Sequence, residues 1–185
     1  MKINSQRNSS TVIAFALMVV AVMACSLGDE TEKANKLVGE GNTAVQEAKK
    51  FVADAEEKKG QMLQTNWSEL AEARNLAKES IAAYDKAGDK CKEAARKYEE
   101  ASKLKINDKF KEYLTLKTKE FDKRAEVVEA AKGTPQALID SDDPPIFKSR
   151  ANANNEKVDK LSKEAEDLAA QADKLQKESK GVFKT

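Results

Sequence analysis

The sequence predicts an all-α protein, an elongated antiparallel helical bundle of about four long helices with coiled-coil-like packing. Charged residues make up 35% of the chain and aromatic residues only 5%, which is typical of long exposed helices and not of a thick globular core. Apolar and small residues recur in alternating steps of three and four, which is the spacing of one helix face. Glycine and proline separate these periodic segments.

The first helix is predicted over residues 30–59. Its stripe consists of small and apolar residues, namely Ala34, Leu37, Gly41, Ala44, Ala48, Phe51 and Ala55. Because most of these side chains are small, a neighbouring helix can approach closely. Gly60 is expected to end the helix, since glycine adopts the left-handed conformation of a C-cap without a steric penalty. The following turn is placed at about residues 60–65.

The second helix is predicted to begin at Asn66, with Glu69 three residues later as in a capping box. Its stripe runs through Leu70, Ala73, Ala77, Ser80, Tyr84, Ala87, Cys91, Ala94, Tyr98 and Ala101. Gly88 lies inside this run and costs about 1 kcal/mol relative to alanine. We therefore expect a bend at Gly88 without a break.

A third helix is predicted after a short turn at residues 105–107, with Asn107 as its cap. Its stripe is Phe110, Leu114, Lys117, Phe121, Ala125, Val128 and Ala131, interrupted by the one lysine. All three prolines follow, so residues 133–149 are predicted to form one long loop. The last helix begins near Ser149, and Gly181 is expected to end it. Its stripe has strict 3-4 spacing and is Val158, Leu161, Ala165, Leu168, Ala172 and Leu175.

Four polar helices of this kind are stabilised mainly by burying their stripes against one another. Short connections favour an up-down bundle. The strict spacing of the last helix leaves a second arrangement open, in which the long loop releases that helix to form an oligomerising coiled coil. A homo-oligomer is therefore an alternative to a single closed bundle.

The first 24 residues have the layout of a signal peptide. Lys2 and Arg7 precede an uninterrupted apolar run over residues 12–24. This run has the length of a signal-peptide core and is shorter than the roughly 20 residues that span a bilayer. An ordinary cleaved signal and an uncleaved signal anchor both remain alternatives to the more specific interpretation that follows.

The block Val22-Met23-Ala24-Cys25 resembles the lipobox of bacterial lipoproteins, although Met23 stands where that family more often has Ala, Ser or Thr. The resemblance covers residues 1–25 only. It implies a signal peptide at 1–24, cleavage after Ala24, diacylglycerol on the Cys25 sulfur and a further acyl chain such as palmitate on the new amino group. Two or three chains anchor a protein stably where one chain does not. Residues 25–29 are then a lipidated cysteine and short linker, and residues 30–185 the helical bundle domain.

The resemblance also implies a membrane destination, which depends on the residue after the cysteine. In the sorting rule of the enteric lipoproteins, Asp there means retention in the inner membrane, whereas this chain has Ser26. The resemblance therefore implies a lipid-anchored protein of the cell envelope, at the outer membrane and facing the periplasm, more than at the inner membrane.

The composition argues against several classes of function. The chain has no histidine, so it lacks the usual general base and the commonest transition-metal ligand. Its 33 basic and 32 acidic residues form no long block of one sign, so nucleic-acid binding has no electrostatic support. Carboxylates mostly lie three or four residues from lysines, as in Glu47 with Lys50 and Glu164 with Lys160, which is typical of a solvated helix face. We expect no enzyme, no metal and no cofactor beyond the lipid.

A few residues remain as candidates for a site. Trp67, the only tryptophan, covers the end of the bundle or is exposed for contact. Cys91 lies on the packing stripe, which favours a packed thiol over a reactive thiol or one paired with another chain. Asp140, Asp142 and Asp143 are expected to form an exposed acidic turn, because they lack the spacing of a calcium-binding loop.

These observations predict a non-enzymatic, lipid-anchored envelope protein that acts as a structural or protein-interaction scaffold, through contact with another envelope protein. The alternative is a periplasmic binding module that carries a small apolar ligand between its helices. A continuous apolar cavity would favour that carrier, and a cleft gathering carboxylates with a lysine or tyrosine would favour an enzyme.

Overall fold

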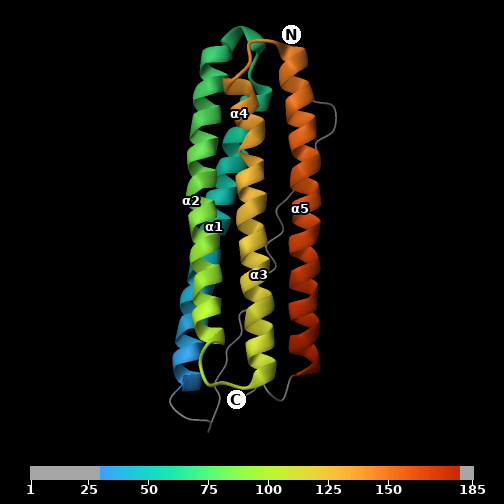
Figure 1. Ribbon diagram of the computed structural model, residues 1–185. Helices are drawn as coiled ribbons and strands as arrows, with labels where there is room; N and C mark the ends of the chain where they lie inside the picture. Colours follow the sequence, from blue (N-terminus) through green and yellow to red (C-terminus); the bar gives the residue numbers. More distant parts are fainter. Residues whose placement is uncertain (1–29, 180–185) are drawn as a thin grey trace.

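The computed structural model describes residues 30–179 and shows an elongated, all-α bundle (Figure 1). The four long helices run alternately in opposite directions: α1 Glu30–Gln64, α2 Leu70–Ser102, α3 Asp108–Ala131 and α5 Pro144–Glu178. Two short helices, η1 Trp67–Glu69 and α4 Gly133–Ile139, lie at the same end of the rod. The predicted fold class is confirmed.

The long helices pack as neighbours in chain order. Helix α1 lies along α2, α2 along α3 and α3 along α5, while α4 packs against α2 and α5. The last helix therefore belongs to the bundle and is not released as a separate coiled coil. Within residues 30–179, no helix combines the length and the apolar content needed to cross a bilayer.

The core follows the predicted stripes and consists largely of alanine with a few large side chains. One apolar cluster near the start of α1 contains Ala34, Tyr98, Phe121 and Leu175, and a second contains Val52, Tyr84, Val128 and Val158. The third cluster, at the end that carries η1 and α4, is called the distal core and consists of Met62, Ala73, Ala77, Ala137, Leu138, Phe147 and Ala151. The opposite end of the rod, where α1 begins, is called the proximal end.

The two predicted helix caps have different outcomes. The Asn107 side chain caps α3 as predicted, because its Oδ1 accepts a hydrogen bond from the backbone N of Lys109 at 2.8 Å. The capping box predicted at Asn66 is wrong, since the Asn66 side chain makes no capping hydrogen bond. The backbone N of Glu69 instead donates to the Asn66 carbonyl at 2.9 Å, which closes the turn of η1. Helix α2 then continues through Gly88 to Ser102.

Gly60 does not end the first helix, contrary to the prediction. Helix α1 continues to Gln64, and Met62 beyond the glycine is fully buried in the distal core. The burial of Met62 extends the apolar stripe by one more turn, and this packing outweighs the cost of about 1 kcal/mol for a glycine inside a helix.

The predicted loop over residues 133–149 is also wrong, because α4 and the first turns of α5 occupy most of it. Pro135 is the third residue of α4, and Pro144 and Pro145 are the first two residues of α5. Proline is tolerated at these positions, where the missing N–H has no partner within the helix in any case. Asp143 caps α5 by accepting a hydrogen bond from Ile146 N at 3.5 Å. Gly181, the predicted end of the last helix, lies outside the described residues.

Candidate functional site

The residues predicted to carry the lipid, Ala24 and Cys25, lie outside the described residues. Trp67 is partly buried in η1 and packs against Phe147 of α5, with 6.1 Å between the ring centroids. Its ring therefore joins the α1–α2 connection to the first turns of α5. This position matches the predicted cover at the end of the bundle.

Cys91 is a packed thiol. Its side chain is fully buried and lies with Ala48 of α1 and Ala125 of α3 in a small apolar cluster. Burial raises the pKa of the thiol to about 12, while Arg124 lowers and Glu120 raises it to a smaller extent. The thiolate, which is the reactive form, is therefore suppressed at neutral pH.

The three aspartates of the predicted acidic turn are exposed as expected. They follow the end of α4, where Asp140 accepts a hydrogen bond from the Gln136 side chain and Asp143 caps α5. Asp142 forms an ion pair with Arg74 of α2, with 2.5 Å between Nη2 and Oδ1. Among residues 30–179, no group of three or more His, Cys, Asp or Glu side chains is placed to hold a metal ion.

Arg74 fixes the turn between α4 and α5 to helix α2. Besides its ion pair with Asp142, its guanidinium donates to the backbone carbonyls of Leu138 and Ser141, both at 3.4 Å. A planar guanidinium with several donors can satisfy a carboxylate and carbonyls together. These three contacts hold the distal end of the bundle as one unit.

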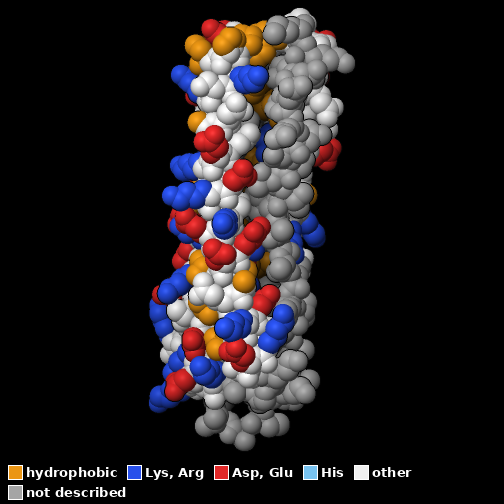
Figure 2. Space-filling view, turned by 90° about the vertical axis from the view of Figure 1, so that its right-hand side faces the viewer, with side chains coloured by type: hydrophobic (Ala, Val, Ile, Leu, Met, Phe, Trp, Pro, Cys, Tyr) orange, Lys and Arg blue, Asp and Glu red, His pale blue; other side chains and the backbone are white. Residues whose placement is uncertain are grey.

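Large apolar side chains that retain solvent contact gather at this distal end. Ile146 in the first turn of α5 is 46% exposed, and no other large hydrophobic residue among residues 30–179 is as exposed. Figure 2 shows hydrophobic side chains gathered at the upper end of the rod. The distal patch comprises Ile146 and the partly buried residues that pack on the distal core, namely Leu63, Trp67, Leu70, Leu76 and Ile139.

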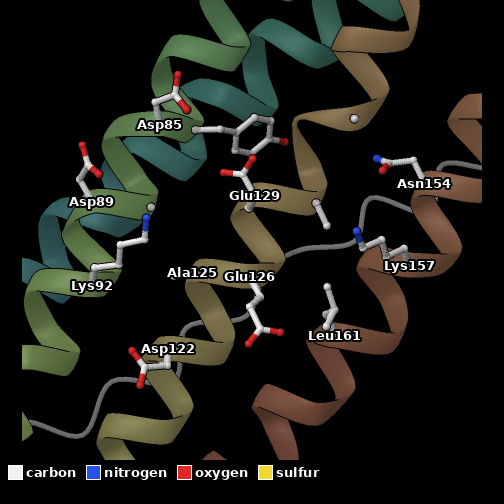
Figure 3. Close-up of a pocket in the computed structure, with 14 residues that line it drawn as sticks. Asp85, Asp89, Lys92, Asp122, Ala125, Glu126, Glu129, Asn154, Lys157 and Leu161 are labelled. Atoms are coloured by element: carbon white, nitrogen blue, oxygen red, sulfur yellow. The ribbon is translucent and has the colours of Figure 1, made fainter.

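A concave surface lies over helices α2, α3 and α5 (Figure 3). This open pocket has a volume of about 840 Å³. Its floor includes small and apolar residues, namely Gly88, Ala125, Ala130, Gly133 and Leu161, and its walls carry Asp85, Asp89, Lys92, Asp122, Glu126, Glu129 and Lys157. The lining brings carboxylates together with lysines and Tyr84, which is the arrangement tied above to an enzyme. These charged side chains distinguish it from the continuous apolar cavity expected of the carrier.

Most of these wall carboxylates take part in ion pairs. Lys132 pairs with both Asp85 and Glu129, at 2.7 Å and 2.6 Å, and Lys123 pairs with Glu126 at 2.7 Å. Tyr84 also lines the pocket, but its hydroxyl donates to Glu56 on α1. The pocket is thus a salt-bridged surface that suits polar, charged contacts.

A buried ion cluster within α3 is the functional-looking feature that sequence reasoning missed. Glu120 is fully buried, and its two carboxylate oxygens accept from Arg124 Nε at 2.7 Å and from Lys117 Nζ at 2.5 Å. The sequence signal was present, because Lys117, Glu120 and Arg124 are three and four residues apart and Lys117 interrupts an apolar stripe. We interpret the cluster as an element of the core, since all three residues belong to one helix.

Ion pairs also join neighbouring helices. Glu47 of α1 pairs with Lys90 of α2 at 2.7 Å, and Glu164 of α5 pairs with Lys123 of α3 at 3.1 Å. These carboxylates were expected to pair with lysines of their own helices. These ion pairs between adjacent helices oppose sliding of one helix along the next.

Comparison with protein-family models, with curated proteins and with solved structures finds no match to this chain.

Proposed function

We propose that this chain is a non-enzymatic, lipid-anchored protein of a bacterial cell envelope, held by acyl chains on Cys25, that acts as a protein-interaction scaffold. The lipobox-like block Val22-Met23-Ala24-Cys25 supports the anchor. The address implied by Ser26 supports the outer membrane, with the bundle facing the periplasm.

The observation that carries the contact role is the position of the distal patch relative to the proposed tether. Cys25 precedes the start of α1 by five residues. Helix α1 has 35 residues, so it separates its two ends by about 52 Å at 1.5 Å per residue. The distal patch lies at the far end of α1, on the connections that follow α1 and precede α5. An exposed apolar surface in that position supports contact with a second protein well away from the tether.

A first experiment tests the anchor. Intact mass spectrometry of the protein purified from bacterial membranes compares the wild type with Cys25→Ala. We expect a mature chain that begins at Cys25 and carries added acyl mass, and we expect both features to be absent in the variant. A chain that retains Met1, or an unmodified chain cleaved elsewhere, would contradict the lipid anchor.

A second experiment tests the contact. A photoreactive amino acid placed at Ile146, on the distal patch, is compared in living cells with the same amino acid at exposed Lys163 on the shaft of α5. We expect a discrete cross-linked species at position 146 that is absent at position 163 and weaker in the Cys25→Ala background. Equal cross-linking at both positions would show that the distal patch is not the contact surface.

A further inference from the structure

Building on the proposed function, we propose that the distal patch binds a cationic amphipathic segment of a protein, in which apolar side chains are flanked by lysine or arginine. Two observations combine here. The patch offers exposed apolar surface, and the charged residues around it carry a net negative charge.

The distal end has a local excess of negative charge. Within residues 60–75 and 133–150, the carboxylates are Glu69, Glu72, Asp140, Asp142 and Asp143, and the cations are Arg74, Lys148 and Arg150. Five carboxylates and three cations give a net charge of −2, and all five carboxylates belong to exposed residues. The whole chain has a net charge of only +1, so this excess is a property of the distal end.

The proximal end provides the contrast. Residues 30–36, 99–112 and 172–179, which form that end, contain eight lysines and eight carboxylates. Their charges balance. The proposed tether would hold the proximal end near the membrane, and anionic lipids would not repel that end. The two ends of the rod therefore differ in net charge.

Arg74 neutralises only Asp142 among the distal carboxylates. Its guanidinium is already engaged with Asp142 and with two backbone carbonyls. Glu69 and Glu72 lie exposed beside Trp67, and Asp140 lies exposed beside Ile139. These three carboxylates therefore form a negatively charged rim next to the apolar residues.

A cationic amphipathic partner satisfies both parts of this surface at once. Its apolar side chains cover Trp67 and Ile146, while its flanking cations meet the carboxylates, which steers association and sets specificity. An anionic bilayer would be repelled by the same carboxylates. A second copy of this chain meeting end to end would bring two negative rims together, so it is also disfavoured.

The experiment uses the full acylated protein reconstituted in phosphatidylcholine vesicles. The probes are three designed helical peptides without tryptophan that share one leucine-rich face and carry lysine, glutamine or glutamate on its flanks. Trp67 is the only tryptophan of the chain, so its emission reports binding at the patch. We expect the lysine peptide to bind at least about tenfold more tightly than the glutamine peptide at low salt, and this preference to shrink at high ionic strength because salt screens exposed charges.

A matched pair of variants locates the effect. The distal variant Glu69→Gln/Glu72→Gln/Asp140→Asn leaves Asp142 and Asp143 in place, because these two hold the turn and cap α5. The shaft variant Glu156→Gln/Glu166→Gln/Asp167→Asn removes the same number of exposed carboxylates from α5. Affinity for the lysine peptide should fall about tenfold in the distal variant and stay unchanged in the shaft variant.

Equal binding of the lysine and glutamine peptides, or equal losses in the two variants, would overturn the cationic partner. A Trp67 response to phosphatidylglycerol vesicles but not to the lysine peptide would assign the patch to a membrane and overturn it as well. If cross-linking at position 146 succeeds in cells while the lysine peptide fails to bind, the contact role stands and only the partner's chemistry is wrong. Failure of both would contradict the contact role itself.

Discussion

Glu120 and Arg124 form an ion pair inside the bundle, one turn apart on α3, with 2.7 Å between Oε1 and Nε. Their side chains are 0% and 4% exposed. Lys117 completes the group by donating to the second oxygen of Glu120. A buried carboxylate is tolerated only when its charge and its hydrogen-bonding capacity are matched, and here two cations of the same helix bind its two oxygens.

Replacing Glu120 by glutamine removes the charge that balances two cations and should lower the free energy of unfolding by about 3 kcal/mol. Urea unfolding followed by circular dichroism measures the change. The control is Glu126→Gln, which breaks a largely exposed pair with Lys123 and should cost less than about 1 kcal/mol. If the two variants lose the same stability, burial is not what makes Glu120 important.

The double variant Glu120→Leu/Arg124→Met removes both buried charges and keeps similar volume. It should recover most of the stability lost in Glu120→Gln, because apolar pairs often replace buried ion pairs without loss. The same urea experiment tests it. A double variant less stable than Glu120→Gln would mean that the charges also fix the arrangement of the helices.

All three tyrosines, Tyr84, Tyr98 and Tyr113, are buried, and burial raises the pKa of each hydroxyl above its ordinary value of 10.0. A raised pKa favours the protonated folded state, so this stability is fully present below about pH 10 and is lost as the pH rises above it. Tyrosinate absorbance and helical circular dichroism should therefore change together on alkaline titration. Ionisation at the ordinary pKa without loss of helix would contradict the burial.

Between about pH 6 and 9 the stability should change little, because the chain has no histidine to titrate there. Urea midpoints at both ends of this range provide the measurement. A marked slope would reveal a strongly shifted carboxyl or lysine, of which Asp122, whose pKa is raised by burial and by Glu99 and Glu126, is the first to replace with asparagine.

Cys91 should resist alkylation in the native protein, since its side chain is 0% exposed and its pKa is raised to about 12. In the Cys25→Ser variant it is the only thiol, because the chain has two cysteines. Labelling by a thiol reagent should be slow in buffer and accelerate with urea as the bundle opens. Rapid labelling of the folded variant would refute the packed thiol.

Two glycines inside helices should respond oppositely to alanine. A Cβ at Gly88 would meet only Val128 Cγ1, at 3.8 Å, so Gly88→Ala should stabilise α2 by about 1 kcal/mol. A Cβ at Gly41 would lie 3.1 Å from the buried Tyr98 ring, so Gly41→Ala should destabilise the α1–α2 contact. Thermal unfolding compares both with the wild type, and a gain in both would mean that Tyr98 moves freely.

The helices could be predicted from sequence because their stripes repeat over many turns, as at Ala73, Ala77 and Tyr84. The errors fell where a single residue was given more weight than packing. Gly60 predicts a helix end, although buried Met62 continues the stripe. The prolines at 135, 144 and 145 predict a loop, although the first turn of a helix tolerates them.

The candidate site was less predictable, because it depends on which residues distant in sequence share one end of the rod. Trp67 is a candidate from sequence, either as the cover of the bundle end or for contact, but Ile146 lies in the segment predicted as a loop. The pairing of Arg74 with Asp142 joins residues 68 positions apart, and no local spacing reveals such a contact. The distal patch and its acidic rim therefore became visible only in the folded chain.

The short connection between α1 and Trp67 has a mechanical consequence. A pull between the start of α1 and a partner held at η1 would load α1 along its own axis, against its long contact with α2. Force in that direction shears many small side-chain contacts at once, whereas a pull across the helices would open them one after another. Because resistance to force depends on the rate of unfolding, the rod should transmit axial tension well and yield easily to sideways peeling.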